Sequence, residues 1–350
     1  MDDANADRVV PAVSVAVMRD GRLAAADARG TLLAGGGQRC TAETVFQACS
    51  ISKPVAAAAA LALVDAGALE LDHDVNDLLT SWRLPVDASR RPITLRQLLS
   101  HTAGLTYCWY PGYAVGEPVP SLVQILNGEP PANTPPVVVE LDPGAEPRYS
   151  GSHYSVVQQL IVDVAGRPFE DVVRELVLEP IGMSFSGYGD AFPRTHAGGA
   201  ARGHDASGAV VPGGWRVMPE MAAAGLWTTP ADLIRFAAEI AAAFRGESLR
   251  VVRPETARAM LAPGAGGRGL GFLAAEVDDD VRFGHPGDSI GYACELVAFA
   301  RRGVGAAVMV NAEGSDDVIH GERSAIAARD GWPALVKDVV GATGFEPATS

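Results

Sequence analysis

The chain is short of positive charge. Its 28 lysines and arginines stand against 42 aspartates and glutamates, so the net charge of the 350 residues is −14. Nucleic acids and anionic membrane surfaces attract clustered cations, and this excess of acid argues against both as partners. Long apolar runs are missing as well. The longest, Val55–Val64, is far short of the roughly 20 residues that span a bilayer.

Cysteines are few and form no motif. The four cysteines show neither a CxxC pair nor the spacing of a metal site: Cys40, Cys49, Cys108 and Cys294. We therefore expect free thiols in a reducing compartment, and neither a metal nor a cofactor. The N-terminus is acidic, whereas a secretory signal begins with cations. Together these features predict a soluble protein of the cytoplasm.

The pattern of apolar residues predicts strands at both ends of the chain and helices between them. Strands are expected at 13–17, 23–28, 281–284, 291–300 and 303–311. Helices are expected at 55–66, 94–99, 155–164, 169–178, 229–244 and 332–340. Residues 106–147, rich in proline, tyrosine and glycine, predict a long irregular segment. This order favours a mixed α/β (α+β) fold in which the terminal strands share one sheet.

Ser50-Ile51-Ser52-Lys53 is the sharpest chemical signal. A serine hydroxyl is a poor nucleophile until a base takes its proton, and a lysine three residues on lies one helical turn away on the same face. Lys53 is one of only two lysines in the chain, the other being Lys337. Arginine stays protonated and cannot act as a base, so a lysine retained here is informative. The alternative is an ordinary serine cap followed by a solvated lysine.

Two further positions carry side chains suited to proton transfer. Tyr149, followed by Ser150-Gly151, could act as a general base or relay beside a lysine. Alternatively, it is a buried aromatic with one hydrogen bond. His285, in His285-Pro286-Gly287, is expected at the end of a strand, where it could give a hydrogen bond or a charge to a reacting centre. Alternatively, it is a histidine of a surface loop.

The three motifs occur in the order Ser-x-x-Lys, Tyr-Ser-x and His-x-Gly, with the segment LLSHTAGL at 98–105 between the first two. In order and spacing they resemble the superfamily of serine β-lactamases, penicillin-binding proteins and esterases. The resemblance is strongest to its class C-like branch, which includes D-aminopeptidases, D,D-carboxypeptidases and carboxylesterases. It covers roughly residues 9–311, including the segments 45–49, 67–72 and 224–232.

The resemblance implies a role for each motif residue. Ser50 would be the acylated nucleophile, and Lys53 and Tyr149 would share its activation and the movement of its proton. His285 would lie beside the substrate, where relatives carry lysine or histidine. Gly287 would lie on the edge strand that faces the acyl group.

The resemblance also implies an oxyanion hole made by the backbone N–H groups of Ser50 and Asp288. Two positions in the substrate site depart from the pattern of lactamases and peptidases. Gly151 stands where their second motif usually ends in asparagine, which removes a side-chain amide that would hold the substrate and the lysine. His285 replaces the lysine common in penicillin-recognising enzymes. Both departures favour the esterase, amidase and aminopeptidase relatives.

We therefore expect one catalytic domain of β-lactamase/transpeptidase-like fold at 9–340, with a mainly helical subregion at about 45–230 and a loose tail at 341–350. The expected enzyme is a serine hydrolase that forms an acyl-enzyme with small esters, amides or D-residue peptides. A class C-like β-lactamase or a D,D-carboxypeptidase is the alternative within this class. Outside it, the alternative is a non-catalytic scaffold or binding protein that retains the fold, for which Gly151 is the main reason.

Overall fold

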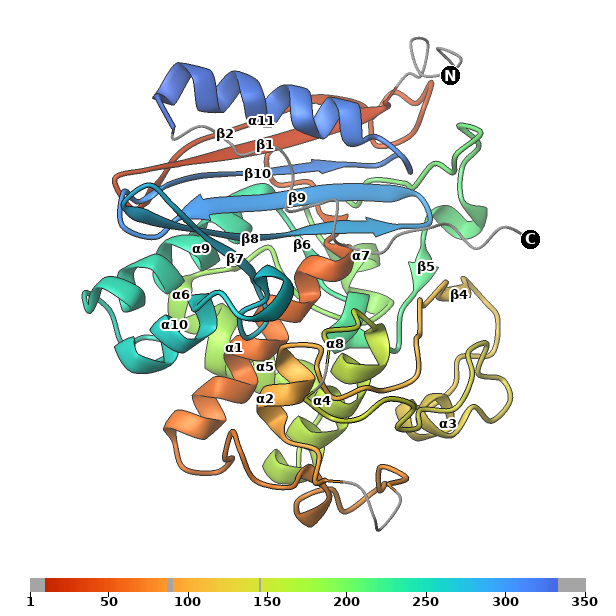
Figure 1. The fold of residues 1–350 in the computed structure, drawn as a ribbon. Coiled ribbons are helices and arrows are strands. Elements are labelled where there is room, and N and C mark those ends of the chain that lie inside the picture. The colour runs from red at the N-terminus through yellow and green to blue at the C-terminus, as the bar shows by residue number, and fades with distance from the viewer. Residues whose placement is uncertain (1–9, 87–90, 145, 333–350) are drawn as a thin grey trace.

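The centre of the molecule is a six-stranded antiparallel sheet in the order β2-β1-β10-β9-β8-β7 (Figure 1). The computed structural model describes residues 10–86, 91–144 and 146–332. The strands are β1 (Ala12–Arg19), β2 (Arg22–Gly30), β7 (Leu273–Val277), β8 (Asp280–Ser289), β9 (Tyr292–Phe299) and β10 (Val304–Val310). Because β1 pairs with β10, the N-terminal hairpin and the C-terminal strands share one sheet, as the sequence predicts.

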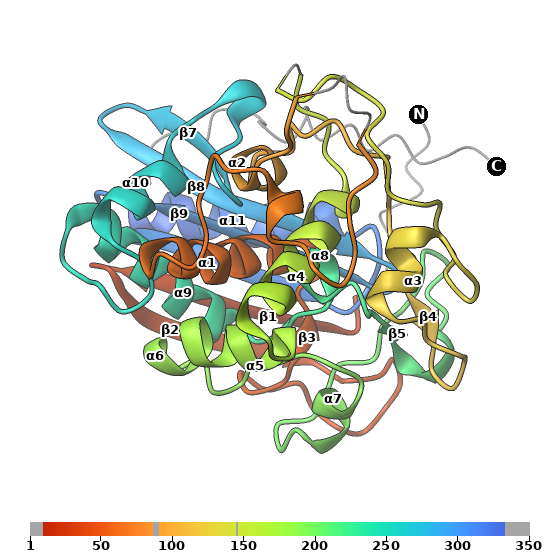
Figure 2. The same ribbon diagram turned by 90° about the horizontal axis from the view of Figure 1, so that it is seen from below.

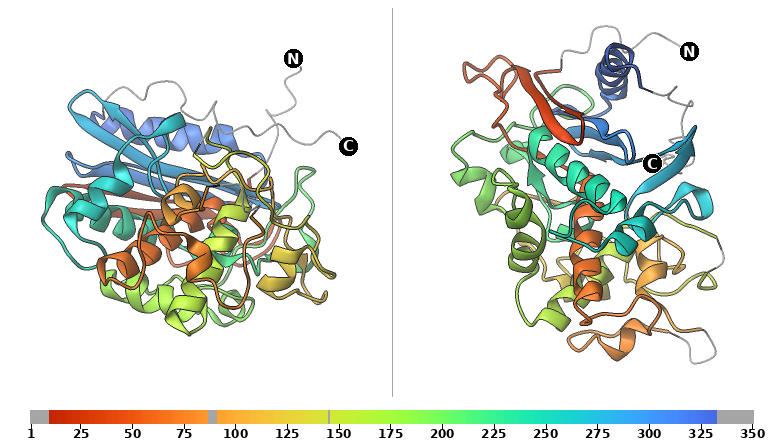
Figure 3. Two further views of the ribbon diagram at one scale, coloured as in Figure 1. Left: turned by 60° about the horizontal axis from the view of Figure 1, so that its bottom comes forward. Right: turned by 90° about the vertical axis from the view of Figure 1, so that its left-hand side faces the viewer.

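Helices cover both faces of the sheet. Helix α11 (Asp316–Asp330) lies on one face, and α9 (Pro230–Arg245) packs on the other, as the edge-on view shows (Figure 3). Strand β1 serves both layers, because successive side chains of a strand point to opposite faces. Its residue Val17 packs with the α11 layer, whereas Ala16 belongs to the main core.

A mainly helical region lies between β2 and β7 in the sequence, on the α9 side of the sheet (Figure 2). Its other helices are α1 (Ser52–Asp65), α2 (Leu95–Leu99), α3 (Leu122–Asn127), α4 (Gly151–Ala165), α5 (Phe169–Val173), α6 (Glu179–Ile181), α7 (Ala191–Thr195), α8 (Met221–Ala224) and α10 (Pro254–Leu261). Helix α1 is its centre. Every residue from Ser52 to Leu61 is buried, which is expected of a helix that is apolar on all sides. Packing against α4, α5 and α8 therefore fixes the N-terminus of α1 in place.

The sequence predicts several helix starts correctly. Thr94 forms a capping box with Gln97, and Thr229 caps α9 through the N–H of Asp232. Other elements were missed: β7, α10 and α11. The reason is clearest for α11, which has only two fully buried apolar residues, Ile319 and Ile326, and so shows little periodicity.

Two predicted boundaries are wrong. Helix α4 begins at Gly151 rather than at 155, and β8 continues to Ser289 rather than ending at 284. Proline is tolerated in β8 because β7 pairs with it only as far as Gly284, which leaves Pro286 on a free edge. Of the closing helix expected at 332–340, only Trp332 lies among the described residues, and the expected tail at 341–350 lies outside them. In the described part of the chain, no helix is both long and apolar enough to cross a membrane.

Candidate active site

Ser50 lies in a short 3-10 turn, Cys49–Ile51, that leads into α1. The turn follows β3 (Phe46–Gln47), which pairs with β6 (Trp227–Thr228). Cys49 has a φ of +48°, a conformation that is uncommon for residues other than glycine and that often marks a functional site. The main chain is therefore constrained immediately before the predicted nucleophile.

The side chain of Ser52 is bonded to the main chain on both sides and has a structural role. Its hydroxyl donates to the carbonyl of Cys49 at 2.6 Å and accepts the N–H of Leu226 at 3.0 Å. Both bonds join the turn around Ser50 to the neighbouring segment. Ser52 is fully buried, so of the two serines in the motif, Ser50 is the one that reaches the open side of the site.

Lys53 contacts Ser50 directly. Its Nζ donates to Ser50 Oγ at 3.0 Å and to the carbonyl oxygen of Ala223, in α8, at 2.9 Å. The side chain is 3% exposed, which excludes the alternative of a solvated lysine. Burial lowers the pKa of Lys53 to about 7; the Cys49 thiol opposes this shift and the charge of Arg268 adds to it. A substantial fraction of the amine is therefore neutral at neutral pH.

Tyr149 lies beside this pair, just before the N-terminus of α4. The Nζ of Lys53 is 4.9 Å from the centre of the Tyr149 ring. Burial raises the pKa of the Tyr149 hydroxyl, while its interaction with the Ser50 side chain and the charge of Arg268 act in the opposite direction. Tyr149 is therefore a neutral phenol that can give a proton, next to a lysine that can take one.

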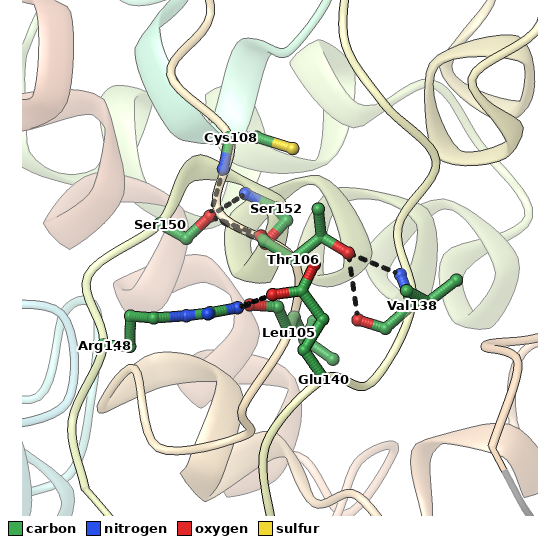
Figure 4. Close-up of polar contacts among 8 residues, drawn as sticks. All are labelled: Leu105, Thr106, Cys108, Val138, Glu140, Arg148, Ser150 and Ser152. Atoms are coloured by element: carbon green, nitrogen blue, oxygen red, sulfur yellow. Dashed lines mark hydrogen bonds and ion pairs between the residues drawn. The ribbon is translucent and has the colours of Figure 1, made fainter. Parts of the chain in front are cut away.

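A network of hydroxyl groups fixes the segment around Tyr149 (Figure 4). Ser150 caps α4, and its hydroxyl donates to the carbonyl of Thr106 at 2.9 Å while accepting the N–H of Cys108 at 2.8 Å. The hydroxyl of Ser152 donates to the same Thr106 carbonyl at 2.6 Å. The irregular segment thus holds the main chain on one side of Tyr149.

The other side of Tyr149 is held by Arg148. Its guanidinium donates to the carbonyl of Leu105 and pairs with the carboxylate of Glu140 (Figure 4). His101 packs behind the tyrosine, with ring centres 4.6 Å apart, and its Nδ1 accepts the N–H of Ser150 at 3.3 Å. These contacts leave the tyrosine ring little freedom, which suits a group that must transfer a proton in one direction.

His285 completes the cluster that the sequence predicts. It lies within β8, 6% exposed, with its ring centre 5.9 Å from that of Tyr149, so it is not a histidine of a surface loop. Burial, and then the charge of Lys53, lowers the pKa of His285 to about 3. The imidazole is therefore neutral and cannot give a charge. Its Nδ1–H donates to the carbonyl of Pro286, so Nε2 is left as a hydrogen-bond acceptor.

Gly287 brings β8 close to the turn before Ser50. A Cβ at this position would lie 2.7 Å from the carbonyl oxygen of Ala48 and 2.5 Å from the Sγ of Cys294. No side chain fits in that space, and the sheet edge therefore approaches the serine as closely as main-chain packing allows. Asp288 follows at the same edge with an exposed side chain.

Gly151 has a steric explanation. A Cβ there would lie 2.5 Å from the ring of Tyr110 and 3.0 Å from the carbonyl oxygen of Cys108. The Tyr110 ring, anchored by a 2.7 Å hydrogen bond to Ser155, thus fills the space that an asparagine side chain would need. The glycine at position 151 is therefore required by the position of Tyr110, a residue of the irregular segment.

Two charged residues near the site were not predicted. Arg268 lies with its guanidinium carbon 5.0 Å from the centre of the Tyr149 ring. Glu220 precedes α8 and is fully buried, and burial raises the pKa of its carboxyl to about 8. The glycines around Arg268, from Gly264 to Gly271, hint at a close approach of this loop to its neighbours, but nothing in the sequence points to the arginine itself.

The β-lactamase family model matches residues 1–329. The chain belongs to the β-lactamase family. This also establishes its fold as β-lactamase/transpeptidase-like, a mixed α/β fold with the antiparallel sheet and helices described above. The family that the three motifs predict is thereby confirmed.

Two relatives and one solved structure show what this chain is similar to. Penicillin-binding protein 4 of Amycolatopsis lactamdurans is 27% identical over 321 residues, which cover 86% of this chain and 81% of that protein. Esterase EstB of Burkholderia gladioli is 29% identical over 199 residues, covering 54% of this chain and 50% of the esterase. The solved structure of D-amino acid amidase from Ochrobactrum anthropi SV3 with D-phenylalanine has a TM-score of 0.71 at 21% identity, covering 92% of this chain and 95% of the amidase.

This β-lactamase-family protein is thus an enzyme, a serine hydrolase related to esterases and penicillin-binding proteins. The family includes proteins named for different substrates, so membership gives the class of chemistry and not the substrate.

Proposed function

We propose that Ser50 is the nucleophile of an acyl-enzyme hydrolase and that Lys53 is the base that takes its proton. The observation that carries this proposal is the 3.0 Å contact between Lys53 Nζ and Ser50 Oγ in a site where burial lowers the pKa of the lysine to about 7. A neutral amine at this distance has a lone pair for the hydroxyl proton. Arginine in its place would remain charged.

The reaction then proceeds in two halves. Ser50 Oγ attacks the carbonyl carbon, its proton passes to Lys53, and the carbonyl electron pair moves to the oxygen. As the intermediate collapses, Tyr149 relays a proton to the leaving oxygen or nitrogen, and the bond to the leaving group breaks. Water next attacks the acyl carbon, the same groups take and return its proton, and the acid leaves with Ser50 restored.

The negative charge that develops on the carbonyl oxygen needs fixed donors. We assign these to the backbone N–H groups of Ser50 and Asp288, because Gly287 brings the end of β8 against the turn that carries Ser50. Neutral His285 would not be a third donor, because its Nδ1–H donates to the carbonyl of Pro286 and its Nε2 is an acceptor. In this proposal the oxyanion hole is built from main chain, with Gly287 as the residue that permits it.

The substrates we propose are small esters and amides, including amides of D-amino acids. Gly151 supports this choice, since it lacks the amide that lactamases and peptidases use and the Tyr110 ring takes the space. The esterase and amidase relatives support it as well. A β-lactamase or D,D-carboxypeptidase activity is the second candidate, favoured by the penicillin-binding protein that this chain matches over 81% of its length.

The test is the intact mass of the protein after exposure to a fluorophosphonate. Wild type should gain one adduct and Ser50→Ala none. Ser52→Ala is the matched control and should still be labelled, because Ser52 is bonded to the main chain and turned away from the opening. A wild type that stays unlabelled would restore the scaffold alternative. Short p-nitrophenyl esters, D-aminoacyl amides and a chromogenic cephalosporin then separate the substrate classes.

A further inference from the structure

Tyr107 and Trp109 are exposed aromatic residues of the irregular segment. Their side chains are 48% and 39% exposed, and no other tyrosine, tryptophan or phenylalanine in the described ranges is as open to solvent. Aromatic rings contribute large apolar areas when they are buried, so two exposed rings leave that stabilisation unused. A single exposed apolar residue needs no explanation, but neighbouring ones on one segment are typical of a binding surface.

The two rings lie on the same side of the segment. Burial alternates along it: Thr106, Cys108 and Tyr110 are buried, whereas the two residues between them are exposed. This alternation is expected of extended main chain, in which successive side chains point to opposite sides and side chains two residues apart point to the same side. Tyr107 and Trp109 therefore form one surface, the aromatic pair.

The start of α4, directly after Tyr149, fixes the main chain under the aromatic pair (Figure 4). The hydroxyl of Ser150 donates to the carbonyl of Thr106 at 2.9 Å and accepts the N–H of Cys108 at 2.8 Å. These two partners are the neighbours of Tyr107 in the sequence. The position of the Tyr107 main chain is therefore set by the residue that follows Tyr149.

The side chain of Tyr107 also lies near that of Tyr149. Partial burial raises the pKa of the Tyr107 hydroxyl, and the hydroxyl of Tyr149 raises it further. Tyr107 is therefore a neutral phenol. The charged side chains next to the segment, Arg148 and Glu140, pair with each other. The aromatic pair itself thus presents ring faces and no charge to a molecule that reaches Ser50.

We propose that Tyr107 and Trp109 form an aromatic subsite beside the reacting atoms, and that the preferred substrates carry an aromatic ring or a similarly large apolar group. This inference rests on the proposed function, in which Tyr149 transfers a proton next to the scissile bond. A substrate ring that covers the aromatic pair would remove apolar surface from water on both partners, and offset or edge-to-face packing of the rings adds to this. Ligand sites typically combine such rings with a few polar groups, here Ser50, Lys53 and Tyr149.

The test compares three esters in which an ethyl or phenyl-bearing group flanks the same reacting carbonyl. Ethyl acetate has no ring, ethyl 3-phenylpropanoate carries a ring in the acyl half, and 2-phenylethyl acetate carries one in the leaving half. Wild type should favour at least one of the two ring-bearing esters over ethyl acetate in kcat/KM by about 10- to 100-fold, mainly through KM, the range expected for the burial of one ring.

Four variants assign this preference to the aromatic pair. Tyr107→Ala and Trp109→Ala should each lower it by about 3- to 10-fold, because each removes one of the two rings. Tyr107→Phe should keep it, because phenylalanine retains the ring and lacks only the hydroxyl near Tyr149. Leu249→Ala is the matched control and should leave the preference unchanged, because Leu249 is 71% exposed and lies between α9 and α10.

Three results would overturn the aromatic subsite. One is a wild type that hydrolyses ethyl acetate without favouring either ring-bearing ester. Another is a preference that survives in either alanine variant. The third is an equal loss in Tyr107→Phe and Tyr107→Ala, which would assign the effect to the hydroxyl beside Tyr149 and not to the ring. Failure of the proposed function looks different, since Ser50 would then not be labelled and none of the three esters would be hydrolysed.

Discussion

Replacing Lys53 by methionine tests whether the lysine is neutral in the folded protein. The folded-state pKa of about 7 lies below the ordinary value of 10.5. Between these values the unfolded chain binds one more proton than the folded chain, so the free energy of unfolding of wild type rises with pH by up to about 1.4 kcal/mol per pH unit from this group. Lys53→Met lacks this contribution. Relative to the variant, wild type should gain about 2 kcal/mol between pH 7 and pH 9.

Urea denaturation of both proteins at pH 7 and pH 9 measures this difference. The variant also leaves Ser50 Oγ and the carbonyl of Ala223 without their donor, but that cost is the same at both pH values and cancels. Ser50→Ala is the control, because it keeps the lysine and should follow wild type. A stability difference between wild type and Lys53→Met that does not change with pH would mean that Lys53 is charged in the fold. The lysine could not then be the resting base.

The remaining predictions concern rate and packing. The kcat/KM for phenyl acetate should rise with pH through one ionisation near 7, since Lys53 must be neutral to accept a proton, and a profile that falls through pH 7 would contradict this. Gly287→Ala should lower the free energy of unfolding by about 1–3 kcal/mol through overpacking, and should also lower kcat. Gly321→Ala is the control: its Cβ would lie in open space on α11, and it should raise the free energy of unfolding by up to about 1 kcal/mol. Equal shifts in Tm for the two variants would refute the reasoning. Gly151→Asn should destabilise the protein on its own, and should do so less when Tyr110→Ala is also present. A double-mutant cycle of urea midpoints should give a coupling of about 1 kcal/mol between the two positions, and strict additivity would contradict the steric explanation.

The part of the site that sequence could predict consists of residues whose spacing is local. Ser50 and Lys53 are one helical turn apart, and any helix that begins at the serine brings them together. Thr94 and Thr229 predict helix starts for the same reason, because the hydrogen bond of a helix cap spans only three residues. The placement of Tyr149 and His285 depends on packing between distant segments, and here the order of motifs in a known superfamily supplied what local spacing could not.

The residues that sequence missed are those whose importance arises only in three dimensions. Gly151 looks like a missing amide in the sequence, but in the fold it is half of a pair with Tyr110, which lies 41 residues earlier in the chain. Arg268 has no motif, and its position over Tyr149 follows from a turn of glycines packed against α1. Weak periodicity hid α11 in the same way, because two buried isoleucines do not define a helical face.

The positive charge beside Tyr149 comes from an element that the three motifs do not include. Relatives that recognise penicillin carry lysine in the third motif, and here that position is His285, which burial keeps neutral. A positive charge is nevertheless present, supplied by Arg268 in the loop before β7, whose guanidinium carbon is 5.0 Å from the centre of the Tyr149 ring.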